Sequence, residues 1–320
     1  MFFETIILKI IEIVLNKMLD LSFSKNSNLR HITKFFARSN PEAIVSKLNS
    51  NEEIVKNVSI LALSKRMPII KLSPDANEHL IDLSEFEDVL KKNNLPNDNM
   101  GILVNEPIWR ADPPSFEYKV LSFAEIMKLR SLSEKPRILS ACAVIVCSET
   151  SSIFLHLRSK KSATYPGLLH TVGGSYLPEN ELVPSHGADR DGLRSTIFRE
   201  IKEEMGIEVS REHKKLPPIL FCEEKSTGFI QTVLLGLNIS KEEGRLVDSK
   251  GQTWEGSVQR IRFSDLYNIM SANKIVPSGK AHLLAWLALG APGISPLQKF
   301  GKMKAKNLFL KLISSNQSCI

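Results

Sequence analysis

The stretch FREIKEEMGIEV, Phe198 to Val209, decides the fold of this chain. It brings three carboxylates together, because at 100° per residue Glu200, Glu203 and Glu204 fall within an arc of about 100° on a helical wheel. Apolar residues occupy a neighbouring arc, which we expect to face a core. Like charges at this spacing cost roughly 0.2–0.5 kcal/mol per pair on an exposed helix. A cation near the three side chains is therefore expected.

Two neighbours of the glutamates indicate a site rather than a solvated acidic face, which is the alternative interpretation. Arg199 lies four residues before Glu203 and can orient it, and Gly206 ends the helix as a C′ glycine does. An apolar, strand-like run, IEV, follows. A short helix that packs on a sheet and carries carboxylates along its edge suits a hard divalent cation such as Mg²⁺, which takes oxygen ligands.

Residues 199–207, REIKEEMGI, resemble the second half of the Nudix box, R-E-U-x-E-E-x-G-U with U aliphatic, and match all seven specified positions. The first half of that box is G-x5-E-x7-R. Asp191 stands at its glutamate position, and the expected glycine is Gly174, the second of the pair Gly173-Gly174. Between Gly174 and Asp191 lie 16 residues instead of five, an insertion of 11. The chain is thus identified as a member of the Nudix hydrolase family with an enlarged loop, in which Asp191 and Gly206 are structural residues of the box.

The resemblance implies a metal site built on the helix. Glu200 and Glu204 resemble the family's principal metal ligands, and Glu203 resembles a further ligand or a water-activating group. Arg199 would hold their geometry. The implied metal is Mg²⁺, with Mn²⁺ as the alternative, and it would neutralise the charge of a diphosphate, orient the phosphates and activate a coordinated water.

A further glutamate from a later loop serves many family members as ligand or general base. In this chain Glu255, just before a predicted strand, fits best, and Glu223 or Glu224 is the alternative. The residues expected to take part in catalysis are Glu203, Glu255 and Arg199. The expected substrate contacts are Arg158, which follows a strand and can meet phosphates, and the pair Gly173-Gly174.

Segments on both sides of the helix predict an α/β fold. Residues 137–159 are typical of two strands joined by a polar turn, and residues 193–205 of a helix. The later segments predict, in order, a strand pair over 216–240, a strand and a helix over 254–270 and an apolar helix over 280–290. This is the order of a Nudix-type α/β/α sandwich with a mixed sheet. A small α/β or α+β accessory domain is expected to precede it.

With 320 residues, the chain is expected to hold one to two domains. The predicted division is an amphipathic N-terminal helical segment over 1–39, an accessory domain of unknown role over 40–135, the Nudix hydrolase domain over 136–292 and a basic C-terminal tail over 293–320. Charges in the N-terminal helix argue against a transmembrane span, and we interpret it as docked on the chain's own core or at a homodimer interface. Peripheral membrane contact through this helix or the basic tail is the alternative.

Cysteine content indicates the cellular compartment, and the distribution of charge indicates which partners to expect. Four cysteines without paired spacing predict a reducing, cytoplasmic location. The basic tail contributes +5 of the net charge of +7, so the rest of the chain is close to neutral. A high isoelectric point that arises in this way does not indicate a specific nucleic-acid partner.

The function implied by the resemblance is Mg²⁺-dependent hydrolysis of the diphosphate linkage in a nucleoside diphosphate joined to another moiety. The alternative is a catalytically weak Nudix domain that acts as a nucleotide-derivative sensor or interaction module. The retained glutamates favour hydrolysis, whereas the long loop and Asp191 favour the alternative modestly. Isomerase activity like that of isopentenyl diphosphate isomerase is not expected, because the strand HTVGG lacks the cysteine that this reaction needs.

Overall fold

The computed structural model describes residues 41–73, 82–93, 96–109, 111, 113–162, 164–178, 192–209, 217–253, 255–295 and 302–314. The N-terminal segment over 1–39, most of the inserted loop and Asp191 lie outside the described residues. The predictions made for them therefore stay predictions.

Twelve strands of the described chain belong to one sheet, and helices alternate with them. The strands are β1 (Val58–Ser64), β2 (Ile69–Leu72), β3 (Asn99–Leu103), β4 (Ser115–Ser122), β5 (Ile138–Cys147), β6 (Ser152–Arg158), β7 (Leu169–His170), β8 (Val172–Ser175), β9 (Ile219–Glu224), β10 (Phe229–Asn238), β11 (Gln252–Thr253) and β12 (Gly256–Arg262). The helices are α3 (Pro41–Asn49), α4 (Glu52–Asn57), α5 (Ser84–Lys92), α6 (Phe123–Ser131), α8 (Gly192–Met205), α9 (Lys241–Lys250), α10 (Leu266–Ser271), α11 (Pro277–Ala288) and α12 (Lys302–Ser314).

Strand β5 organises the sheet. One of its edges pairs in parallel with β10 along the strand. Its other edge is covered in turn by β3 at Ile138, by β8 over residues 140–143 and by β6 over residues 145–147, all antiparallel. The sheet is mixed because β5 is parallel to β10 and antiparallel to its other three neighbours. The strand pairs predicted over 137–159 and 216–240 are confirmed as β5–β6 and β9–β10.

All ten residues of β5 are buried, because both faces of the strand are covered. Its odd-numbered side chains, such as Ala141 and Ala143, lie in the hydrophobic cluster that α8 covers. Its even-numbered side chains, such as Val144 and Val146, lie in the cluster that α11 covers. A strand buried on both faces has a continuous apolar sequence, as ILSACAVIVC does.

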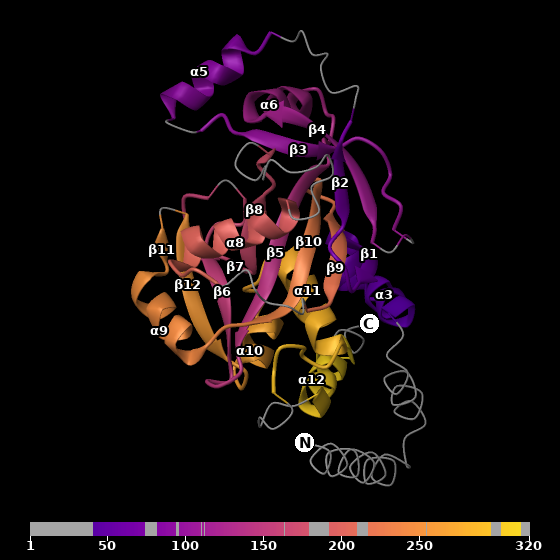
Figure 1. Ribbon diagram of the computed structural model, residues 1–320, viewed down its shortest axis with the longest axis vertical. Coiled ribbons are helices and arrows are strands. Elements are labelled where there is room, and N and C mark those ends of the chain that lie inside the picture. The colour runs from indigo at the N-terminus through magenta and orange to yellow at the C-terminus, as the bar shows by residue number, and fades with distance from the viewer. Residues whose placement is uncertain are drawn as a thin grey trace.

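Helices cover both faces of the sheet around β5 (Figure 1). Helix α8 packs against β5 and β8 on one face. Helix α11 packs against β9 and β10 on the other, together with α3, α4 and α12. The predicted α/β class with a mixed sheet is confirmed.

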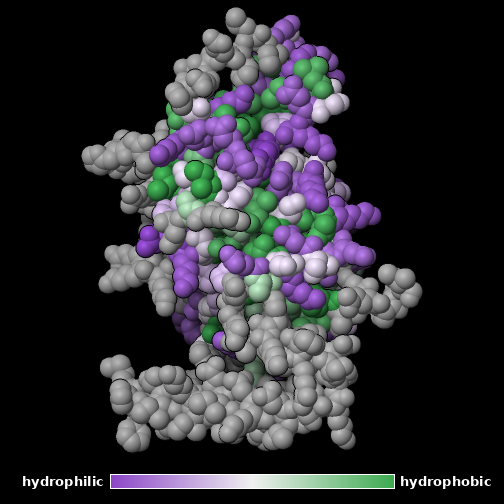
Figure 2. Space-filling model, turned by 90° about the vertical axis from the view of Figure 1, so that its right-hand side faces the viewer, coloured by the Kyte–Doolittle hydropathy of each residue, from purple (hydrophilic) through white to green (hydrophobic). Residues whose placement is uncertain are grey.

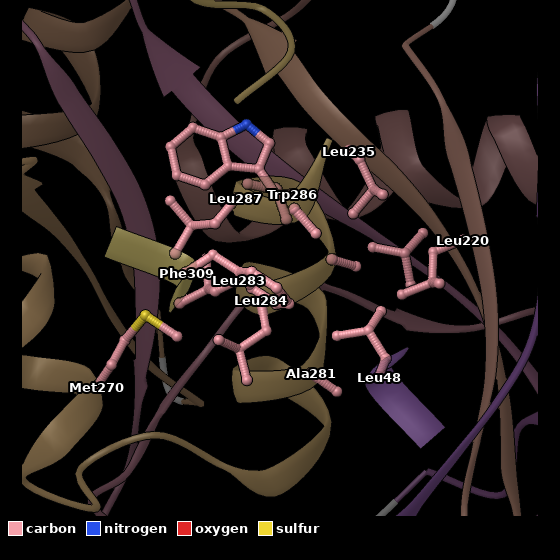
Figure 3. Packing of buried hydrophobic residues seen from close by; sticks show 14 of the residues in the cluster. Leu48, Leu220, Leu235, Met270, Ala281, Leu283, Leu284, Trp286, Leu287 and Phe309 are labelled. Carbon is pink, nitrogen blue, oxygen red and sulfur yellow. The ribbon is translucent and has the colours of Figure 1, made fainter. Parts of the chain in front are cut away.

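Helix α11 is buried on almost every side, and Figure 3 shows why. Its leucines and Trp286 contact side chains from both the sheet and neighbouring helices. The labelled partners are Leu220 of β9, Leu235 of β10, Leu48 of α3, Met270 of α10 and Phe309 of α12. Full burial of one such side chain stabilises a fold by about 1.5–3 kcal/mol. Because Phe309 lies in this cluster, the basic segment after residue 293 contributes a packed helix, α12, to the core.

The region over 40–135 shares the sheet and the cores with the rest of the chain. Strand β1 pairs with β9, and β3 pairs with both β4 and β5. Ile60 and Leu48 lie in the cluster of α11, whereas Phe116 and Tyr118 lie in the cluster of α8. An accessory unit over 40–135 with a role of its own stays a prediction.

Helix α9 is an element that the apolar pattern did not predict. Its sequence, KEEGRLVDSK, is largely polar, and Val247 is its main buried apolar residue. The local feature that could have revealed it is a capping box, in which Ser240 and Glu243 satisfy each other's backbone N–H groups.

The distribution of apolar residues on the surface is relevant to the alternative of peripheral membrane contact. Figure 2 shows a face on which hydrophilic and hydrophobic residues are intermixed over the described part. Exposed large apolar residues such as Leu72 and Ile108 lie in separate strands, helices and loops, as is normal for a protein surface. Across the described helices, none combines the length and apolar character needed to cross a bilayer.

Candidate active site

Helix α8 presents the predicted carboxylates to the sheet edge at β8 and β6. The helix ends at Met205, and Gly206 follows it with a φ of 68°, the left-handed conformation that glycine adopts without strain. Ile197, Ile201 and Met205 are fully buried against the sheet. This apolar contact fixes the rotation of the helix and therefore the direction of its carboxylates.

The three glutamates are not equivalent. Glu200 and Glu204 are buried, with 7% and 4% of their surface exposed, whereas Glu203 is exposed. One helical turn separates the two buried carboxylates, so they lie side by side above the sheet. Glu203 lies at the solvent side of the pair.

Arg199 is the cation beside this cluster. Its Nη1 lies 2.8 Å from Glu200 Oε1 and 2.9 Å from Glu203 Oε2. Its Nη2 donates to the carbonyl oxygen of Ser175 at the end of β8, at 3.0 Å. One guanidinium thus links two of the carboxylates to the sheet. Because three carboxylates face this single cation, the cluster holds more negative than positive charge.

The glycine pair on β8 lets α8 approach the sheet. A Cβ at Gly174 would lie 2.1 Å from Glu200 Oε1, which is closer than any side chain could stand. Gly173 donates its backbone N–H to Glu204 Oε2 at 3.3 Å, and a Cβ there would lie 2.3 Å from the Ala141 carbonyl oxygen. The two glycines are therefore needed for the buried carboxylates to rest directly on β8.

We expect Gly174→Ala to displace the Glu200 carboxylate and to destabilise the protein by about 1–3 kcal/mol, the usual cost of overpacking. Urea unfolding and Mn²⁺ binding would measure the two effects. Gly244→Ala in α9 is the matched control, because its Cβ would meet the Arg260 side chain and Phe154 at 3.2 Å, away from the carboxylates. Equal stability and equal Mn²⁺ affinity in the two variants would contradict the expectation.

Burial dominates the electrostatics of Glu200. Removal from water, together with the charges of Glu204 and Glu203, raises the pKa of this carboxyl to about 8, although Arg199 opposes the shift. The metal-free site therefore resists carrying its full negative charge near neutral pH. A bound divalent cation would relieve this cost.

Glu255 lies near the cluster, in the turn between β11 and β12. Its pKa is raised first by partial withdrawal of the carboxyl from water and then by Glu204, whereas His156 and Arg158 act in the opposite direction. The residue as a whole is exposed, so the carboxyl remains accessible from solvent.

The two alternative glutamates have other partners. Glu223 Oε1 lies 3.6 Å from Arg137 Nε. Glu224 is buried, and its Oε2 accepts a hydrogen bond from Ser278 Oγ at 3.0 Å. Of the three candidates, Glu255 is therefore the one with a described interaction with α8.

Arg158 lies at the end of β6, beside an open pocket of about 310 Å³. Its Nε donates to the carbonyl oxygen of Thr164 at 2.9 Å, which orients the guanidinium. The pocket is lined by Leu157, Arg158, Ser159, Lys160, Thr253, Gly256 and Ser257. Glu255 lies between two of these residues along the chain, so the cationic pocket adjoins the acidic cluster.

His156 lies at the centre of the site and belongs to none of the motifs recognised in the sequence. This residue of β6 is 4% exposed, and its Nδ1 lies 2.5 Å from Glu204 Oε1. A histidine within the apolar strand IFLHL was the available sign of an unusual environment.

The residues present fit a magnesium ion. No group of three or more His, Cys, Asp or Glu side chains in the described ranges is preassembled with metal-ligand geometry. Mg²⁺ requires less, because it commonly binds through one or two carboxylates and keeps waters or substrate phosphates as its other ligands. Glu200 and Glu204 supply two such carboxylates, and the pKa of Glu200 is raised mainly by burial, a cost that a cation would offset.

No protein-family model and no curated protein matches the chain. Among solved structures, it is similar to a MutT protein from Methanosarcina mazei, at 16% identity and a TM-score of 0.30 over 58% of this chain and 99% of that one. It is also similar to a Nudix hydrolase from Alicyclobacillus acidocaldarius, at 11% identity and a TM-score of 0.32 over 47% of this chain and 90% of that one.

A third similar structure is a bifunctional NMN adenylyltransferase/ADP ribose pyrophosphatase from Francisella tularensis, complexed with AMP and manganese. The identity is 15% and the TM-score 0.34, over 51% of this chain. The match spans 46% of the Francisella protein, so about half of that chain has no counterpart here.

Proposed function

We propose that this chain is a magnesium-dependent pyrophosphohydrolase of the Nudix type. It would split a nucleoside diphosphate joined to another moiety into a nucleoside monophosphate and a second phosphorylated product. The observation that carries the proposal is the pair of buried carboxylates, Glu200 and Glu204, held against a glycine pair on the sheet with Arg199 beside them. A buried, net-negative oxygen cluster is suited to a hard cation and to the phosphates that the cation binds.

Each residue has a distinct part in this proposal. Glu200 and Glu204 would hold Mg²⁺, with Glu203 as an additional ligand on the solvent side. The ion, when bound, neutralises phosphate charge and lowers the pKa of a coordinated water. Arg199 keeps the carboxylates in place through its contacts with Glu200 and Ser175.

Glu255 would take the proton from the attacking water. A general base works best when its pKa lies near the working pH, and the upward shift of Glu255 moves it in that direction. Arg158 and the pocket beside it would bind anionic or polar groups of the substrate, together with the backbone of Gly173 and Gly174.

We expect Glu255→Gln to lower kcat by about 10²-fold or more, the usual contribution of a general base. Glu223→Gln is the matched control, and it should stay within about threefold of wild type because Glu223 pairs with Arg137 instead. Steady-state kinetics at saturating Mg²⁺ would give both values. If Glu223→Gln were the slower enzyme, the assignment of the base to Glu255 would be wrong.

The test of the proposed function is product release with Mg²⁺ and with excess chelator. The panel would hold ADP-ribose, nucleotide sugars, dinucleoside polyphosphates, NADH, coenzyme A and nucleoside triphosphates. Metal-dependent cleavage of one class would establish hydrolysis and identify the substrate together. No cleavage, combined with a metal-dependent thermal shift by one compound, would indicate a binding protein instead.

A further inference from the structure

His156 contacts a carboxylate that the proposed function assigns to the metal. His156 Nδ1 lies 2.5 Å from Glu204 Oε1. A carboxylate that binds a metal is ionised and can only accept hydrogen bonds, so in that state Nδ1 carries the shared hydrogen. The other oxygen, Oε2, accepts the backbone N–H of Gly173 at 3.3 Å. Glu204 is thus held from two sides, by β6 and by β8, and each oxygen keeps a lone pair for a cation.

The imidazole ring has little freedom to turn away from Glu204. His156 pairs with Val258 of β12 and with His170 of β7, so strands flank it on both sides. A Cβ at Gly256 would lie 2.6 Å from His156 Nε2, which shows how closely the β12 backbone covers the far edge of the ring. The ring therefore lies in a closed space between β12 and α8.

The environment of the second ring nitrogen indicates that the role of His156 is its contact with Glu204. His156 Nε2 is buried and has no hydrogen-bond partner among the described residues. A buried polar atom without a partner costs stability, and an apolar side chain would avoid that cost. Such a group in a core needs an explanation, and the contact of Nδ1 with Glu204 supplies one.

We infer that His156 is a positioning residue of the metal site. By donating Nδ1–H to Glu204 Oε1, it sets the direction in which this carboxylate presents its remaining lone pairs. Removal of a group that orients a metal ligand typically lowers metal affinity by 10–100-fold. The inference rests on the proposed function, because it requires that Glu204 bind a metal.

The test is Mn²⁺ binding to the full chain without substrate, measured from the electron paramagnetic resonance signal of free Mn²⁺. The variants are His156→Asn and His156→Gln, which are both neutral amides. Asn places its amide nitrogen near the position of Nδ1 and can still donate to Glu204, whereas Gln places it near Nε2. We expect His156→Asn to bind within about threefold of wild type and His156→Gln to bind about 10–100-fold more weakly.

Two further variants separate the possible outcomes. Glu204→Gln defines the loss expected when the ligand itself is removed, and His156→Leu removes both ring nitrogens at similar volume. Urea unfolding of each variant shows whether its Mn²⁺ affinity follows its free energy of unfolding or the position of its hydrogen-bond donor. Equal Mn²⁺ affinity in the Asn and Gln variants would overturn the positioning role while leaving the metal site standing. Failure of the wild-type chain to bind Mn²⁺ would overturn the metal site and the inference with it.

Discussion

Glu204→Gln should lower kcat by about 10²–10³-fold, the cost of losing one strong electrostatic contact in a transition state. The substitution removes a charge and almost no volume, so the fold should be retained. Glu204 is 4% exposed and is held by His156 and Gly173, so its carboxylate is fixed within the cluster. Steady-state kinetics across a range of Mg²⁺ concentrations would measure the loss.

Glu208→Gln is the matched control for this variant. Glu208 follows the same helix but is exposed, and it pairs with Lys202 at 2.5 Å. We expect its kcat to stay within about twofold of wild type, because exposed ion pairs contribute little. A Glu204→Gln enzyme with most of its activity would show that Glu204 is not a metal ligand.

Glu200→Gln should inactivate the enzyme and yet stabilise the metal-free protein at pH 8. Burial raises the pKa of Glu200 to about 8 from an ordinary value of 4.5. The folded state therefore holds this proton more tightly than the unfolded state does. Stability that is present below pH 4.5 is lost as the pH rises toward 8, and a neutral amide avoids that loss.

The expected gain at pH 8 is on the order of 2–4 kcal/mol, since each pKa unit corresponds to about 1.36 kcal/mol. Urea unfolding of wild type and Glu200→Gln between pH 5 and pH 8, with chelator present, would show a difference that grows with pH. Mg²⁺ should then stabilise wild type and have much less effect on the variant. A difference that did not change with pH would indicate a packing effect instead of a buried charge.

Sequence by itself determined the elements that depend on local patterns. The limits of α8 follow from its apolar periodicity and from Gly206, and both were predicted to within one residue. The pairs β5–β6 and β9–β10 follow from apolar runs separated by turns. The cluster of glutamates beside Arg199 was likewise evident, because residues three and four apart on a helix are neighbours wherever the helix lies.

Tertiary structure alone decided which side chains meet across elements. Burial of Glu200 and Glu204 but not Glu203 depends on the rotation of α8 against β5 and β8. The contact between His156 and Glu204 joins residues that are 48 positions apart in the chain. The pairing of β1 with β9, which ties residues 58–64 to the sheet, spans a still longer separation.

The physical reason is that these contacts are fixed by sheet register and helix packing. Register places His156 opposite Val258 and His170, and the missing Cβ atoms of Gly173 and Gly174 allow α8 to come close enough for its carboxylates to reach β6 and β8. Neither the register of β6 nor the close approach of α8 to β8 can be read from the sequence of β6 or of α8 alone. The sequence therefore predicts which groups could bind a metal, and only the fold decides which of them are buried together and what holds them in place.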